Sequence, residues 1–148
     1  MTAPLRMTFD VDCLPHHAFA VWTSQIGTWW PRDHTVSGDA AEVVLESGEG
    51  GRIYERTSTG VRHEWGEVTV WEPPRRLGYR WHLGRDRAAA TEVEITFIAE
   101  GEARTRIQIE HGGWEKLGAE ADASRDQNRG GWDALLPHFT AAAERRAD

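Results

Sequence analysis

Residues 63–81, with the sequence HEWGEVTVWEPPRRLGYRW, decide the fold class of this chain. Residues 63–72, and the segment that begins at residue 76, are rich in β-branched and aromatic side chains, a composition typical of strands. Two prolines at positions 73 and 74 separate these segments and mark a turn. Such a short link favours antiparallel pairing of the two strands.

Four more segments after residue 40 have the same character. Period-two alternation of apolar and polar side chains, or a β-rich composition, extends over residues 42–46, 51–58, 91–100 and 104–111. The separators between them are short and turn-like, with several glycines. We therefore predict six strands that follow one another as an antiparallel meander.

The N-terminal part adds one strand and two helices. Residues 7–11 alternate between apolar and polar side chains, which predicts a strand with one face in water. Pro15 ends this strand and suits the first turn of a helix. Apolar side chains then recur at helical spacing, which predicts a helix over residues 15–23 and a shorter one over residues 25–30.

The C-terminal segment changes to a helical period. Its apolar side chains are three or four residues apart, at Trp132, Leu135, Leu136, Phe139 and Ala143. This spacing predicts an amphipathic helix that can begin near Asp122 and reaches about Arg145. Gly130 and Gly131 weaken this helix, and Pro137 predicts a kink or a local loss of hydrogen bonding.

Together these elements predict an α+β fold in one domain spanning residues 1–148. A curved seven-stranded antiparallel sheet grips the long C-terminal helix, and two short helices lie between the first and second strands. The terminal helix is the only predicted element long enough to cover the apolar face of the sheet. Where side chains of the helix and the sheet do not meet, such a grip leaves a cavity.

Composition and charge argue against several classes of protein. A formal net charge of −7 provides no basic face for nucleic acid or for an anionic membrane. Cys13 is the only cysteine, so an internal disulfide is impossible and a reducing cytoplasm is the expected location. No segment approaches the ~18 consecutive apolar residues of a membrane span, so we expect no membrane insertion.

The sequence also lacks the motifs of common catalytic sites. Its histidines do not show the spacing of a zinc site, and no Gly-x-Ser-x-Gly motif is present. We expect no metal, no cofactor and no catalytic nucleophile.

Several motifs give the chain a family resemblance. They are IGTWWP at 26–31, GGRIYERTSTG at 50–60, the quoted stretch at 63–81, TEVEITF at 91–97, IEHGGWEKLG at 109–118 and GGWDALL at 130–136. With these motifs the chain resembles the START-like (SRPBCC) helix-grip superfamily, in the branch named for the activator of the heat-shock ninety chaperone ATPase. The resemblance covers nearly the whole chain and implies the helix-grip fold. Across that superfamily the fold holds lipids, hormones and polyketides, and some members are cyclases or other enzymes.

Strand alternation selects two polar candidate residues. Glu55 and His111 share the faces of the apolar side chains on their strands, so each would enter an apolar wall. A buried carboxylate must find a partner, water or a ligand, or take up a proton. The alternative is that both residues lie half exposed at strand ends with ordinary partners.

Aromatic residues complete the candidate pocket. Tyr79 and Trp81 share one face of a strand, and Trp29 and Trp132 are expected near the same cavity. Trp65 has two placements open to it, lining the concavity or covering an outer surface. The candidate ligand-binding residues are therefore Trp29, Glu55, Trp65, Tyr79, Trp81, His111 and Trp132.

The function that these observations favour is binding of a hydrophobic or aromatic small molecule in an internal cavity. One alternative is a chaperone co-regulator that acts through its surface, with a chaperone or a second copy of the chain as partner. Another is a cyclase- or hydrolase-type enzyme in which Glu55 and His111 supply acid–base chemistry. A cavity would agree with the first and third hypotheses, and a solid core with an exposed apolar patch would agree with the second.

Overall fold

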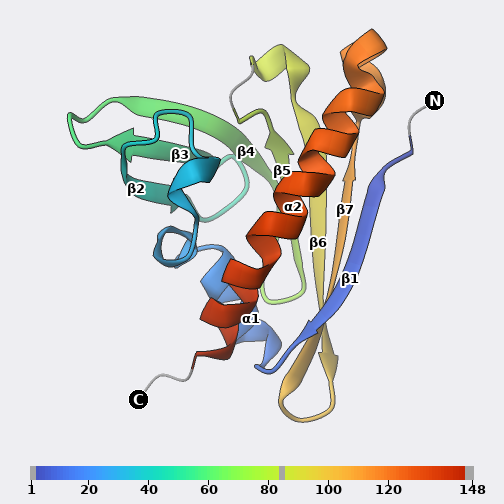
Figure 1. Cartoon of the computed structure of the whole chain (residues 1–148). Helices are drawn as coiled ribbons and strands as arrows, with labels where there is room; N and C mark the ends of the chain where they lie inside the picture. The colour runs from blue at the N-terminus through green and yellow to red at the C-terminus, as the bar shows by residue number, and fades with distance from the viewer. Residues whose placement is uncertain (1–2, 84–85, 146–148) are drawn as a thin grey trace.

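A computed structural model describes residues 3–83 and 86–145 of the chain (Figure 1). Within these residues, seven strands form one antiparallel sheet in the order β1-β7-β6-β5-β4-β3-β2. Their bounds are β1 Leu5–Val11, β2 Ala40–Leu45, β3 Arg52–Thr57, β4 Arg62–Glu72, β5 Arg76–Trp81, β6 Thr91–Glu100 and β7 Arg104–Gly112. The meander is as predicted, and β1 pairs with β7 to form one edge of the sheet.

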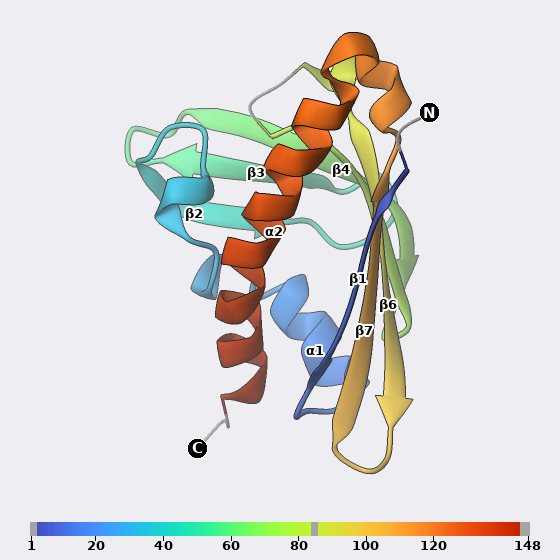
Figure 2. The same ribbon diagram turned by 45° about the vertical axis from the view of Figure 1, so that its right-hand side comes forward.

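The two α-helices lie on the concave side of this sheet (Figure 1). They are α1 Pro15–Trp22 and α2 Ala121–Glu144. The described residues also contain four 3₁₀ helices, namely η1 Ile26–Thr28, η2 Arg32–His34, η3 Arg87–Ala89 and η4 Trp114–Glu120. Figure 2 shows α2 crossing the curved sheet, with α1 beside the C-terminal half of α2. This is the predicted helix-grip fold.

The segment between β1 and β2 is more irregular than a helix pair. The predicted helix over residues 15–23 is α1, but the second becomes η1 and η2, each of three residues. The side chains of Thr23 and Thr28 donate hydrogen bonds to the carbonyl oxygens of Phe19 and Gln25, respectively. Such bonds compete with regular helical pairing.

The sheet bends at β4, because its register shifts on both sides. Between β3 and β4, Ile53 pairs with Gly66 and the next residue, Tyr54, pairs with Glu64, so that Trp65 is the extra residue of a bulge. A second irregularity separates Val68 from Val70 in the pairing with β5. A side chain at Gly66 would collide with the Arg80 carbonyl oxygen, so this position needs glycine.

An aromatic core joins the helices to the sheet. The ring of Trp22 in α1 lies 4.6 Å from Phe139, 5.4 Å from Trp29 and 6.1 Å from Trp132, between ring centroids. Phe139 and Trp132 belong to α2, and all four side chains are buried.

No helix within the described residues is long and apolar enough to cross a membrane.

The long helix begins and ends close to the predicted positions. It runs from Ala121 to Glu144 and continues through Pro137. Proline has no N–H, so the carbonyl four residues earlier lacks its usual helical donor at this point. Gly130 and Gly131 lie inside the helix, in spite of their low helical propensity.

Candidate functional site

A pocket of about 200 Å³ lies between α2 and the inner face of the sheet. Strand β5 and Leu83, two residues after its end, provide one wall, and α2 provides the opposite wall. The segment around η2 forms part of the rim. The lining residues are Trp30, His34, Tyr79, Trp81, Leu83, Gln127, Asn128, Gly131, Trp132 and Leu135.

Aromatic rings form a continuous group around this pocket. Trp30 lies 5.7 Å from Trp81, which lies 5.6 Å from Tyr79, between ring centroids. Behind them, Trp65 lies 5.0 Å from Trp30 and 5.8 Å from Trp81. The rings are tilted or edge-on to one another, which is the favourable geometry for aromatic pairs.

Gly131 leaves the helical wall of the pocket open. It faces the pocket, and a Cβ atom added there would meet no other atom within 4 Å. Gly130 has the same free space but is exposed and does not line the pocket. The glycine that weakens the helix therefore also widens the pocket.

Glu55 lies behind the pocket wall and is fully buried. Its carboxylate accepts hydrogen bonds from the backbone N–H groups of Val36 and Ser37, from the Ser37 hydroxyl at 2.6 Å and from the Trp65 indole N–H at 2.8 Å. Burial raises the pKa of Glu55, but these hydrogen bonds outweigh it and hold the pKa below its ordinary value. The carboxylate thus fixes the segment directly after η2, the 3₁₀ helix that ends at His34, to the sheet.

His111 is also fully buried, and it connects the two walls of the pocket. Its Nδ1 atom accepts a hydrogen bond from the Trp132 indole N–H at 3.0 Å, so the proton of the neutral ring is on Nε2. Nε2 then donates to the Thr91 hydroxyl at 2.7 Å, and that hydroxyl donates to the Trp81 carbonyl oxygen at 3.3 Å. Burial lowers the pKa of His111 to about 3, which keeps the ring neutral.

The candidate residues chosen from the sequence divide into two groups. Tyr79, Trp81 and Trp132 line the pocket. Glu55 and His111 point into the interior, as strand alternation predicts, but they contact other protein groups behind the wall. Among the described residues, no hydrogen bond joins the two side chains.

The two remaining tryptophan candidates also lie behind the pocket. Trp29 packs in the core and donates its indole N–H to the Val21 carbonyl oxygen at 2.7 Å. Trp65 takes the interior placement of the two that were open to it, because the bulge turns its side chain towards Glu55.

Sequence reasoning missed several lining residues. Trp30 follows Trp29 directly, and the motif IGTWWP contains no signal that tells which of the two rings faces a pocket. Gln127 and Asn128 lie one helical turn before Gly131, so a helical wheel centred on the glycine would have found them.

His34 is the one imidazole among the described lining residues. Its Nδ1 atom lies 2.9 Å from the Asp33 carboxylate, whose pKa is held below its ordinary value by this hydrogen bond. An ionised carboxylate only accepts hydrogen bonds, so Nδ1 carries a proton and Nε2 of the neutral ring is an acceptor. No Asp, Glu, Lys or Arg is present among the described lining residues.

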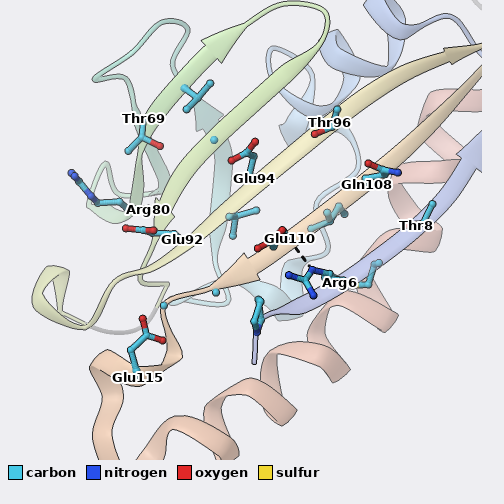
Figure 3. A pocket seen from close by; sticks show the side chains of 18 residues that line it. Arg6, Thr8, Thr69, Arg80, Glu92, Glu94, Thr96, Gln108, Glu110 and Glu115 are labelled. Atoms are coloured by element: carbon cyan, nitrogen blue, oxygen red, sulfur yellow. Dashed lines mark ion pairs between the residues drawn. The ribbon is translucent and has the colours of Figure 1, made fainter. Parts of the chain in front are cut away.

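A second, larger hollow of about 1040 Å³ lies on the opposite face of the sheet (Figure 3). Figure 3 shows charged and polar side chains from neighbouring strands along it, among them Arg6, Arg80, Glu92, Glu94 and Glu110. Arg6 and Glu110 form an ion pair at 3.7 Å, with both side chains mostly exposed. The described residues that line it include no aromatic side chain, so this hollow lacks the walls that an apolar ligand needs.

The described residues contain no group of three His, Cys, Asp or Glu side chains that could hold a metal ion.

Comparisons with solved structures give the same fold. An anthrahydroquino-gamma-pyrone synthase, Txn09, complexed with SUM, is 29% identical, with 81% of this chain and 82% of that chain covered and a TM-score of 0.60. CalC, a self-sacrificing resistance protein from Micromonospora echinospora, is 25% identical over 95% of this chain and 94% of its own, with a TM-score of 0.72.

A more distant neighbour shares the fold alone. The Hsp90 activator PFC0360w from Plasmodium falciparum is 17% identical, with 75% of this chain and 73% of that chain covered and a TM-score of 0.55. No curated protein matches the chain.

The family profile described as "Activator of Hsp90 ATPase homolog 1-like protein" matches residues 12–144. This match includes α1, strands β2 to β7 and the whole of α2, and therefore every residue that lines the pocket. The chain belongs to the family of Activator of Hsp90 ATPase homolog 1-like proteins, with the helix-grip fold of the START-like (SRPBCC) superfamily.

Proposed function

We propose that this protein binds a flat aromatic small molecule in the pocket between α2 and β5. The observation that carries the proposal is an aromatic-walled pocket whose helical side is opened by Gly131. Pockets for small molecules are typically apolar and aromatic, with a few polar groups that orient the ligand. Here Trp30, Trp81 and Trp132 supply the aromatic surface, and His34 is one of the polar groups.

The volume of the pocket limits the size of the ligand. Drug-sized ligands occupy pockets of roughly 300–1,000 Å³, whereas an apolar cavity of about 150 Å³ accepts benzene. A pocket of about 200 Å³ therefore suits one or two fused rings. A larger aromatic molecule would insert one end and leave the rest outside.

The residues behind the walls support a preformed site. The Glu55 carboxylate fixes the segment after η2, and His111 with Thr91 connects Trp132 on α2 to Trp81 on β5. Walls held in place before binding lose less conformational entropy when a ligand enters. We propose that these buried polar groups position the pocket and do not contact the ligand.

Two solved relatives are consistent with this proposal. Txn09 is described as a synthase of an anthrahydroquino-gamma-pyrone and was solved in complex with SUM, and CalC is described as a self-sacrificing resistance protein. Neither description establishes the ligand of this chain, because one fold serves many functions.

The co-chaperone alternative has less support. The exposed large apolar side chains of the described residues are Leu14, Val36, Val61 and Ile98, which come from four different segments. An enzymatic role for Glu55 and His111 is also disfavoured, because neither residue lines the pocket.

A matched pair of glycine variants tests the proposal. Gly131→Leu would place a side chain in the pocket, whereas Gly130→Leu makes the same change on the exposed side of the same helix. Both substitutions should stabilise the helix by about 0.5–1 kcal/mol, because each replaces a glycine in a helix interior. Only Gly131→Leu should weaken ligand binding.

Isothermal titration with naphthalene and 1-naphthol measures the effect. We expect wild type and Gly130→Leu to bind with equal Kd, and Gly131→Leu to bind at least about tenfold more weakly, a loss of about 1.4 kcal/mol. If Gly131→Leu binds both compounds as wild type does, the ligand site lies elsewhere. If wild type binds neither compound, the proposed function is wrong.

A further inference from the structure

One edge of the sheet is open in the described part of the chain. Strand β1 pairs with β7 and with no other described strand, and Figure 1 shows it as the outermost strand, with no other element beyond it. The backbone N–H and C=O groups on the outer side of an edge strand are a template for pairing with a strand of another chain.

Strand β2, at the opposite edge, is less suited to such pairing. Its register with β3 shifts between Ala40 and Glu42. Helix η1 lies against it, so that a Cβ atom added at Gly27 would come within 2.8 Å of the Val43 carbonyl oxygen. Bulges and covering elements protect edge strands, whereas β1 has an uninterrupted register along its whole length.

Helix α2 fixes both ends of β1. The Arg125 side chain donates a hydrogen bond to the Ala3 carbonyl oxygen at 2.7 Å. At the other end, the backbone N–H of Asp12 donates to the Glu144 carboxylate at 2.9 Å. The edge is therefore ordered before a partner arrives, which lowers the entropic cost of pairing.

The sequence of β1, LRMTFDV, is self-complementary about its central residue, Thr8. If two β1 strands pair antiparallel with Thr8 opposite Thr8, Arg6 of each copy lies opposite Asp10 of the other. Both side chains are on the exposed face of the strand, and unlike charges opposite each other stabilise a strand pair. Charges on an edge strand usually oppose pairing, but this symmetry brings opposite charges together.

The apolar face of β1 has the same symmetry. In this register Met7 of each copy lies opposite Phe9 of the other, and a methionine sulfur beside an aromatic ring is a favourable contact. Met7 and Phe9 are half-buried, whereas Ile109 and Ile107, their partners on β7, are buried. A neighbouring strand would complete the cover of the apolar face at this edge.

We propose that this edge pairs with a second copy of the chain, β1 against β1, with a two-fold axis at Thr8. The two seven-stranded sheets then form one continuous sheet, with both α2 helices on the same face. Because a two-fold interface repeats every contact, each dimer contains two Arg6–Asp10 pairs.

Sedimentation-velocity ultracentrifugation of the full chain tests the association. One strand from each copy forms a small interface, so we expect a weak dimer, with mostly monomer at about 1 µM and mostly dimer at about 500 µM. A chain that remains monomeric up to the higher concentration leaves this edge in water or pairs it with a strand of another protein. Either result would show that the proposal is wrong.

Exchanging the two charges tests which surface associates. Arg6→Asp and Asp10→Arg each replace two attractive contacts per dimer with two repulsive ones, so each should raise the Kd of the dimer about tenfold. The double variant restores unlike pairs and should recover most of the wild-type affinity. It carries both disturbed contacts with Glu110 and Arg106 on β7, so recovery would not come from changes within one chain. A dimer that neither single change weakens would overturn the proposal.

Disulfide cross-linking tests the register. Cys13 is the only cysteine, so the variants are made with Cys13→Ser. Thr8→Cys places two thiols opposite each other at the two-fold axis, and oxidation should give a covalent dimer. Arg6→Cys is the matched control on the same face, because its two thiols would lie about 14 Å apart along the strands, too far for a disulfide. Equal cross-linking of both variants would contradict pairing centred on Thr8.

Discussion

Replacing Glu55 with glutamine should destabilise the protein far more than the same change at the surface. The four groups that contact the Glu55 carboxylate all donate hydrogen bonds to it. The amide group of glutamine can accept only through its oxygen, and its NH₂ group would face a donor. The Ser37 hydroxyl can rotate to accept from this NH₂ group, but the Ser37 backbone N–H cannot.

The magnitude follows from these contacts. Glu55→Gln loses at least one hydrogen bond to a buried charge and weakens the others, and each hydrogen bond to a charged group contributes about 1.5–3 kcal/mol. We expect the free energy of unfolding to fall by about 2–4 kcal/mol. For a chain of this size, that loss corresponds to a decrease in Tm of about 5–15 °C.

Urea denaturation measures this change, with Glu42→Gln as the control. Glu42 pairs with Arg56 at 2.6 Å, but both side chains are substantially exposed, so its loss should cost no more than about 1 kcal/mol. If Glu55→Gln lies within about 0.5 kcal/mol of wild type, the carboxylate does not hold the segment after η2 and the reasoning is wrong.

The effect of Glu55 should also depend on pH. Its pKa is lowered in the folded state, so the carboxylate stabilises the protein above its ordinary pKa of 4.5, and this contribution disappears as the pH falls through the folded-state pKa. The glutamine variant does not titrate at this position. The difference in unfolding free energy between wild type and Glu55→Gln should therefore narrow below about pH 4.5.

Three further predictions concern single side chains. Burial lowers the pKa of His111 to about 3, so its imidazole signals should not titrate between pH 5 and 8 in NMR spectra, and a titration midpoint near pH 6 would contradict the buried neutral ring. The contribution of the neutral ring to stability should be lost as the pH falls from 6.5 towards 3. Tyr79→Phe without ligand should leave the free energy of unfolding unchanged or raise it by up to about 1 kcal/mol, because the Tyr79 hydroxyl lacks a good hydrogen-bond partner. A loss of more than about 1 kcal/mol in urea denaturation would show that the hydroxyl has such a partner. Burial, followed by the charges of Glu144 and Asp12, raises the pKa of Cys13 from 9.0 to about 11. Iodoacetamide at pH 8 should therefore alkylate Cys13 roughly a hundredfold more slowly than an ordinary thiol, and equal alkylation rates would refute the raised pKa.

Alternation and turn chemistry were sufficient to predict the architecture. In β7, buried and exposed side chains alternate from Arg104 to His111, and this period also placed His111 in the interior. The pattern is strong because one face of the sheet is covered and the other is in water. The same reasoning was ambiguous at Trp65, since a bulge changes which face a residue occupies and leaves no sign in local composition.

The pocket was harder to predict because its members come from segments without a regular period. Trp30 and His34 are placed by the chain path after α1, which depends on hydrogen bonds to a carboxylate on β3. Such partners are distant in sequence and carry no periodic signal. The sequence shows that Gly131 lowers the helical propensity of its segment. That the missing side chain also leaves open space in the pocket becomes clear only when the opposite wall is known.

The most direct test of the account is the position of a bound aromatic ring, read from intermolecular nuclear Overhauser effects between 1-naphthol and ¹³C,¹⁵N-labelled protein. We predict contacts from the ligand's aromatic protons to the rings of Trp30, Trp81 and Trp132, and their loss in Gly131→Leu but not in Gly130→Leu. Contacts to Thr8 and Gln108 on the outer face of the sheet, or contacts that persist in Gly131→Leu, would contradict binding between α2 and β5.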